Sequence, residues 1–164
     1  MIKDALSVLP ARPVLYIVPV IVVLVLSFYY RDLYTKCSSI KQYRVALNEL
    51  LHSMDASAQF RLVEFTDFSW DTVRIVANLK SGARSVECPF GWNWSSGERE
   101  SVIASGLLTA MIFGREGAIV RYLELRSDEV SFRGADSSLT PETAVFSIAK
   151  NFDNGSEVTL TLNP

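Results

Sequence analysis

Two carboxylates whose spacing could support acid–base chemistry flank a short aromatic stretch of the chain. Asp67 and Asp71 bracket F-S-W, and a loop could bring the two acids together. Glycosidases need two such groups at a defined separation across a sugar, and aromatic rings suit a sugar ring. An aspartate before a strand more often hydrogen-bonds its own backbone, and Asp71 directly precedes T-V-R-I-V. We expect this structural role; a carbohydrate binder or hydrolase using Asp67 and Asp71 is the alternative.

Histidine and cysteine, which often carry chemistry, are scarce. His52 is the one histidine and ends an expected helix, where it suits the helix dipole better than catalysis. Cys37 and Cys88 are too few and too far apart for a zinc site. They could pair in an oxidising compartment or be buried thiols in the cytosol. With a net charge of −2 and no phosphate-binding or nucleophile motif, we expect no enzyme, cofactor, metal or nucleic-acid partner.

An aromatic segment, C-P-F-G-W-N-W at residues 88–94, places Phe90, Trp92 and Trp94 at every second position. An extended backbone would turn the three rings to one face, either as a packed strand or as an exposed platform for a partner. We expect Phe90 to be buried, Trp94 to be partly exposed and Trp92 to be intermediate. The partner-binding residues that we assign are Trp92, Trp94 and Arg99.

An apolar run follows an N-terminal tail of residues 1–12. Residues 13–30 are 18 positions without a charge, near the lower limit for crossing a hydrocarbon layer of roughly 30 Å. Tyr29 and Tyr30 lie at its end, as interface anchors do. A cleaved signal peptide would need small residues after the run, and S-F-Y-Y-R-D offers none. We predict a retained single-pass transmembrane anchor, kinked near Pro19.

The orientation of this anchor depends on two opposing arguments. Lys3 and Arg12 precede the run, whereas four basic residues lie within 31–44, so the literal charge count places the C-terminal part in the cytoplasm. A short tail with one downstream domain is the simplest arrangement for an exported protein, and long domains translocate with little regard to charge. We expect a protein of the cell membrane whose C-terminal domain is periplasmic or otherwise extracytoplasmic.

An amphipathic helix is predicted after the anchor, over residues 31–54. Apolar residues recur on one stripe that only Arg44 interrupts. The stripe consists of Leu33, Cys37, Ile40, Leu47, Leu51 and Met54. Because a coiled-coil seam would not favour Arg44, we expect this helix to cover the domain's own sheet; a homodimer through residues 31–54 is the alternative.

Strand patterns dominate residues 55–164, the expected globular domain. Candidate strands are Q-F-R-L-V-E-F, T-V-R-I-V-A-N-L, L-L-T-A-M-I-F, A-I-V-R-Y-L-E-L, E-V-S-F, A-V-F-S-I-A and E-V-T-L-T-L. The loop G-R-E-G and the turn D-N-G-S each join a hairpin, and a short helix capped by Ser95 or Ser96 ends at Gly106. The predicted fold is α+β, with one mostly antiparallel sheet of six or seven strands and one short helix.

One segment carries a resemblance to other proteins. Residues 68–76, with the pattern F-x-W-D-x-V-x-I, resemble a segment of small, uncharacterised bacterial proteins that have an N-terminal membrane or lipid anchor and one compact domain. The resemblance implies an exported bacterial domain and supplies no activity. We expect a membrane-anchored protein-binding module of the bacterial envelope, such as an assembly factor or a toxin-inhibiting protein, in contact with the lipid bilayer and an unidentified protein.

The anchor leads to a first prediction about location. The protein should remain in the membrane pellet after washing with high salt or alkaline carbonate, because about eighteen apolar residues are buried in lipid. Immunoblotting of pellet and supernatant measures this. Recovery of the full-length chain in the supernatant would contradict the anchor.

Overall fold

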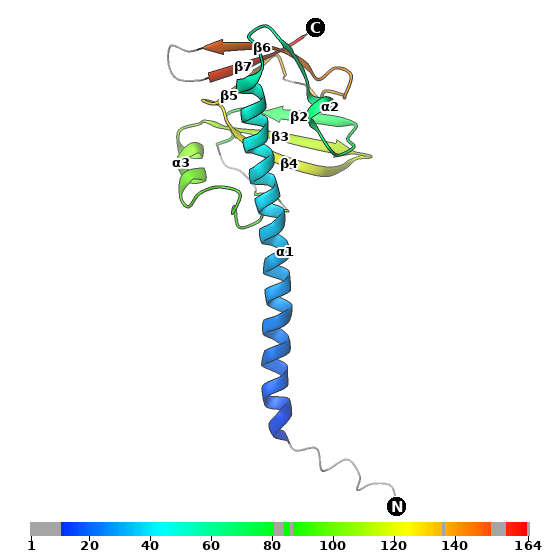
Figure 1. Ribbon diagram of the computed structural model, residues 1–164, viewed down its shortest axis with the longest axis vertical. Helices are drawn as coiled ribbons and strands as arrows, with labels where there is room; N and C mark the ends of the chain where they lie inside the picture. Colours follow the sequence, from blue (N-terminus) through cyan, green and yellow to red (C-terminus); the bar gives the residue numbers. More distant parts are fainter. Residues whose placement is uncertain (1–10, 81–83, 86, 136, 152–156, 164) are drawn as a thin grey trace, which may run out of the picture.

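The computed structural model describes residues 11–80, 84–85, 87–135, 137–151 and 157–163. Its longest element is helix α1, Ala11–Ser53, whose 43 residues span about 65 Å. Pro19 lies inside α1, yet Figure 1 shows this helix as one continuous rod, so the predicted kink is not seen. The anchor and the membrane-proximal helix are thus one element, since no glycine or proline interrupts residues 31–53.

The first half of α1 has the properties of a membrane span. The segment Ile17–Ser53 contains a stretch with a mean hydropathy of 1.7, and only 6% of that stretch is buried. Side chains from Ile17 to Tyr30 are exposed, and Figure 1 shows this part of the helix standing clear of the domain. The protein therefore has one N-terminal helix that is long and apolar enough to cross a membrane.

In the described part of the chain, seven strands and two short helices follow α1, which confirms the α+β class and the strand count. The elements are β1 (Gln59–Arg61), α2 (Leu62–Phe65), β2 (Thr72–Val76), α3 (Glu98–Ala104), β3 (Leu108–Arg115), β4 (Ala118–Arg126), β5 (Val130–Arg133), β6 (Val145–Asn151) and β7 (Glu157–Leu162). The described strands form two sheets, of order β1-β6-β7-β5 and β2-β3-β4, instead of the expected single sheet. All pairs are antiparallel except β5 with β7.

The division into two sheets begins at residues 59–65, which were expected to form one strand. The chain leaves β1 after Arg61 and makes the helical turn α2, so β1 pairs only with β6. Phe60 and Leu62 are both buried. Their spacing of two residues fits a continuous strand and also a short strand followed by a turn, so the sequence did not distinguish the two.

The predicted hairpin β3–β4 is confirmed, with a tighter turn than expected. Gly114 and Arg115 pair within the ladder, and only Glu116 and Gly117 form the turn. Both have positive φ, 53° and 80°, as the favoured two-residue hairpin turn requires. The pairing of β6 with β7 is also confirmed; the D-N-G-S turn between them lies outside the described residues.

The main core lies between α1 and the two sheets. The stripe predicted on residues 31–54 faces it: Cys37, Ile40, Leu47 and Leu51 are buried, and Met54 packs against them. Strand residues complete this core: Val73, Met111, Phe113, Leu123, Phe146, Ile148, Val158 and Leu160. The helix therefore covers the domain's own sheets, as predicted.

The segment 88–94 is not a strand. Its backbone makes consecutive turns, with Gly91 N–H donating to the Cys88 carbonyl and Trp94 N–H to the Gly91 carbonyl, both at 3.1 Å. Phe90 is 44% exposed and Trp92 39%, whereas Trp94 is 5% exposed. The predicted order of burial is therefore reversed for Phe90 and Trp94. Pro89 and Gly91, which has a φ of 66°, favour turns over a ladder.

Trp94 belongs to a second, smaller core on the opposite face of β3. It packs there with Val102 of α3 and with Leu108. The N-cap residue of α3 is Gly97, which has no side chain to cap the helix. The prediction that Ser95 or Ser96 caps this helix is therefore wrong. Glu98 instead reaches back and accepts a hydrogen bond from the Ser95 N–H at 3.1 Å.

A disulfide joins α1 to the aromatic segment. Cys37 and Cys88 are bonded, with their Cα atoms 5.0 Å apart. The sequence left open whether these cysteines form a disulfide or are buried thiols, and in the structure they form the disulfide. The bond holds the start of the 88–94 segment on α1, one turn beyond Tyr34.

The disulfide closes a loop between residues 51 positions apart, which predicts a measurable contribution to stability. Cys37→Ser/Cys88→Ser should lower the free energy of unfolding by about 2–4 kcal/mol, because the unfolded chain regains the entropy of that loop. Urea unfolding followed by tryptophan fluorescence measures this. Reductant should destabilise the wild type and leave the double variant unchanged; a wild type insensitive to reductant would contradict the prediction.

Candidate functional site

Two of the three predicted partner-binding residues lie in a buried polar network, the Glu124 network, formed by Trp94, Arg99, Tyr122 and Glu124. Glu124 lies on β4 opposite Ala110, on the face that α3 covers. Its Oε2 accepts hydrogen bonds from Trp94 Nε1 at 2.7 Å and from Arg99 Nε at 2.9 Å. Tyr122 donates to Oε1 at 3.2 Å.

The electrostatics of the Glu124 network fix its protonation. Burial, and then the Glu124 charge, raises the pKa of Tyr122 to about 12. The hydrogen bond to Glu124 raises the pKa of Arg99. Tyr122 thus stays neutral and Arg99 stays charged at neutral pH. Arg99 and Glu124 are only 5% and 3% exposed, so the pair is largely part of the interior.

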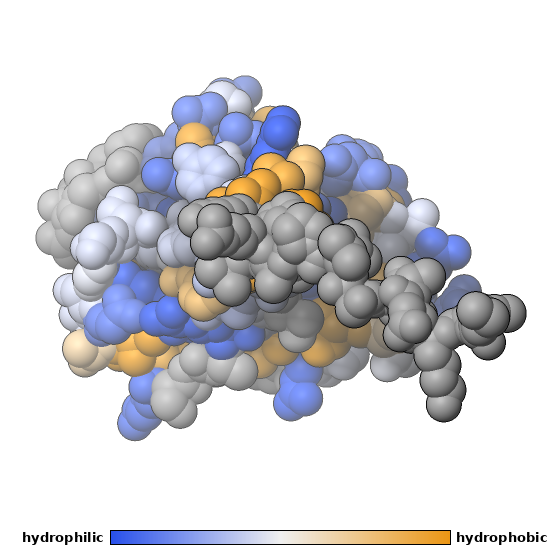
Figure 2. Space-filling model, turned by 90° about the horizontal axis from the view of Figure 1, so that it is seen from below, coloured by the Kyte–Doolittle hydropathy of each residue, from blue (hydrophilic) through white to orange (hydrophobic). Residues whose placement is uncertain are grey.

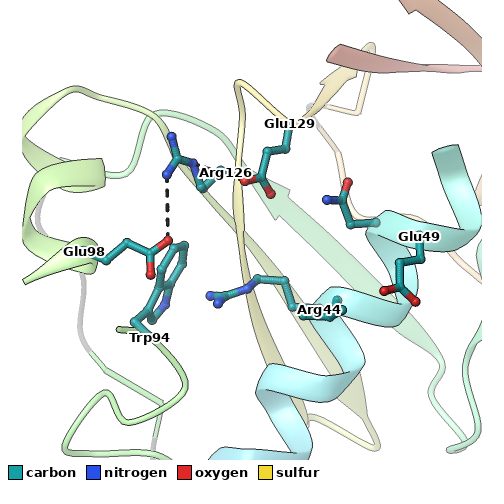
Figure 3. A pocket seen from close by; sticks show the side chains of 8 residues that line it. Arg44, Glu49, Trp94, Glu98, Arg126 and Glu129 are labelled. Carbon is teal, nitrogen blue, oxygen red and sulfur yellow. Dashed lines mark ion pairs between the residues drawn. The ribbon is translucent and has the colours of Figure 1, made fainter. Parts of the chain in front are cut away.

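A cavity of about 260 Å³ lies between α1 and the residues around Trp94, and we call it the α1 cavity (Figure 3). Its lining is Arg44, Val45, Asn48, Glu49, Trp94, Glu98, Arg126 and Glu129. Arg44 points from α1 toward Trp94, and its guanidinium carbon lies 3.8 Å from the ring centroid. Its Nη2 donates to the Asn93 carbonyl at 3.1 Å. Arg44 therefore interrupts the apolar stripe because it fastens α1 to the 88–94 segment.

Two polar atoms on the wall of the α1 cavity are buried. Arg44 Nη1 and Asn48 Oδ1 have no hydrogen-bond partner within the described part of the chain. Burial lowers the pKa of Arg44, and the nearby charges of Glu98 and Glu129 oppose this effect. An arginine nevertheless remains protonated in proteins.

The residues considered for acid–base chemistry are engaged in the fold. Asp71 Oδ2 accepts a hydrogen bond from the Glu116 N–H at 2.7 Å, which braces the β3–β4 turn. The Asp67 charge adds to burial in raising the pKa of Tyr43. The His52 ring Nδ1 is in hydrogen-bond contact with the Asn48 carbonyl of the same helix at 2.8 Å. Among the described residues, no group of three or more His, Cys, Asp or Glu side chains is placed to hold a metal ion.

An apolar hollow of about 470 Å³ lies where β4 begins, and we call it the Ile119 pocket. Its lining is Arg84, Ser85, Glu87, Ile112, Ile119, Val120, Arg121 and Tyr122. Ile119 is 71% exposed, more than any other large apolar side chain in the described part of the chain. In the described sheet β4 pairs with β3 alone, so Ile119 stands on an edge strand. Sequence reasoning missed this site because three separate segments form it.

Trp92, the third predicted partner-binding residue, lines a hollow of about 370 Å³ together with Trp94 and Arg99 of the Glu124 network. Its ring stacks on Phe90, with centroids 5.0 Å apart, and lies 6.3 Å from both Tyr30 and Tyr34 of α1. All three assigned residues therefore border one hollow, although Trp92 alone of the three is exposed.

The chain was compared with known proteins. No protein-family model matches it, and neither the curated proteins nor the solved structures searched include a match.

The Glu124 network leads to a prediction about stability. Glu124→Gln should lower the free energy of unfolding by about 3–5 kcal/mol, because the buried Arg99 charge loses its carboxylate. Asp128→Asn is the matched control: it removes a carboxylate that pairs with the more exposed Arg126 at 2.7 Å, and should cost less than about 1 kcal/mol. Urea unfolding of both variants tests this, and equal losses would contradict a special role for the buried pair.

Proposed function

We propose that this protein is a membrane-anchored protein-binding module of the bacterial envelope, and that it acts without catalysis. In this proposal α1 crosses the cell membrane once and the domain is extracytoplasmic. The Ile119 pocket receives apolar side chains of a protein partner. The bacterial source follows from the sequence resemblance at residues 68–76.

The compartment is supported by the disulfide. A bond between Cys37 and Cys88 persists in an oxidising space such as the periplasm and is rare in the cytosol. This argument opposes the count of basic residues around the anchor, which favours a cytoplasmic domain. We give the disulfide more weight, because long domains translocate with little regard to charge.

The main observation in favour of partner binding is that Ile119 is exposed at the Ile119 pocket. Its lining includes the apolar or aromatic residues Ile112, Val120 and Tyr122 and the charged residues Arg84 and Glu87. Interfaces combine an apolar centre with a polar rim in this way. An aromatic or aliphatic side chain seated there would bury Ile119, and such central contacts supply most of the binding energy of an interface.

The alternative of a carbohydrate hydrolase gains no support from the geometry. Asp71 is engaged with the Glu116 N–H, and Trp94 is buried with Glu124. A homodimer through residues 31–54 would have to use the outer face of α1, where Val45 and Leu50 are exposed, because the apolar stripe already covers the core.

Site-specific crosslinking tests the binding proposal. A photoreactive amino acid at position 119, in cells that produce the full-length protein, should give one major adduct of defined mass. Ile119→Ser should weaken co-purification of the same partner about tenfold or more while leaving the melting temperature unchanged, because Ile119 contributes to contact and little to the core.

The matched control is Val63, an apolar residue of α2 that is 38% exposed and does not line the Ile119 pocket. A photoreactive group at position 63 should give no adduct, and Val63→Ser should bind normally. Equal adducts at both positions, or full binding by Ile119→Ser, would refute the assignment of the pocket.

A further inference from the structure

Four aromatic side chains gather where α1 leaves the domain, and we call them the aromatic cluster: Tyr30, Tyr34, Phe90 and Trp92. Phe90 and Trp92 stack, and the Tyr30 ring centroid lies 6.1 Å from that of Phe90 and 6.3 Å from that of Trp92. All four side chains are exposed, Tyr34 most of all at 64%. The four rings pack on one another and still face outward, so the aromatic cluster is a surface that the described chain leaves uncovered.

The aromatic cluster lies at the level where the apolar run ends. Tyr30 is the last residue before Arg31, the first charge after the run. Residues 13–30 rise about 27 Å along a helix, which is short of a hydrocarbon layer of roughly 30 Å. The boundary of that layer therefore falls at or just beyond Tyr30, beside Phe90 and Trp92.

The backbone holds Phe90 and Trp92 in this position. Cys88 is bonded to Cys37 on α1, and Trp94 is fixed in the small core by Glu124. The exposed turn between them is thus tethered at both ends. Because the rings are already ordered, they would lose little conformational freedom on entering a new environment.

We propose that Phe90 and Trp92 insert into the headgroup region of the same bilayer that α1 crosses. The domain then contacts the membrane at a second point beside its anchor. Amphipathic aromatic rings prefer this region, and Tyr30 and Tyr34 extend the same surface along α1. Figure 2, viewed from the N-terminal end of α1, shows hydrophobic side chains among polar ones on the face that would meet the lipid. The inference rests on the proposed membrane anchor, and it is independent of the Ile119 pocket.

Lipid is favoured over a protein as the occupant because the cluster is continuous with the apolar surface of α1. The exposed apolar side chains run without interruption from Phe28 through Tyr29 to Tyr30, and Phe90 and Trp92 pack beside the last of these. A protein covering Trp92 would have to displace lipid from that boundary.

Quenching by brominated lipid tests the proposal with the full-length protein in phosphatidylcholine vesicles. Bromine atoms placed on the acyl chain near the glycerol backbone quench only nearby tryptophans. Because Trp92 is one of three tryptophans, these vesicles should remove up to about one third of the emission seen in unbrominated vesicles. Trp92→Phe should abolish this quenching.

Trp70→Phe is the matched control, because it removes a buried tryptophan of the main core and should leave the absolute loss of emission unchanged. Flotation of the vesicles reports the anchor separately. If the protein floats with the vesicles and Trp92 is not quenched, the insertion of the turn is refuted while the anchor stands. If the protein does not float, the anchor itself fails, and with it this inference.

Discussion

The burial of one stripe of α1 against both sheets is the interaction on which the rest of the structure depends. Cys37, Ile40, Leu47 and Leu51 belong to one core cluster with residues of β2, β3, β4, β6 and β7. The two sheets share no strand, so this helix and the side chains beneath it hold them together. The same helix continues into the exposed apolar segment, and one element therefore meets two environments without a break.

Polar groups near α1 serve attachment more than chemistry. Arg44 lies across Trp94, Trp94 donates to Glu124, and Glu124 neutralises Arg99. This chain of contacts leads from the helix through the 88–94 segment to α3. Together with the disulfide it ties the aromatic segment at both ends, which explains why Trp94 is buried while Trp92, two residues away, is exposed.

Features set by local periodicity were predictable from the sequence. The repeat of Leu33, Ile40 and Leu47 indicated the buried stripe, and turn residues located both late hairpins. Features set by distant partners were not. Arg99 and Glu124 are 25 positions apart and carry no local signal of pairing. Alternation also misled at residues 88–94, where Pro89 and Gly91 direct the backbone into turns that a count of aromatic residues does not reveal.

The continuity of α1 has a consequence for the angular position of the domain. Each residue of an α-helix turns the chain by about 100°. Because no break separates the exposed apolar half of α1 from the half that carries the core stripe, the direction in which Ile119 faces is determined by the helical phase of the exposed apolar half. A single residue added within residues 17–30 would rotate the whole domain relative to any helix packed against that apolar half, whereas a whole number of turns would only change the distance along the helix axis.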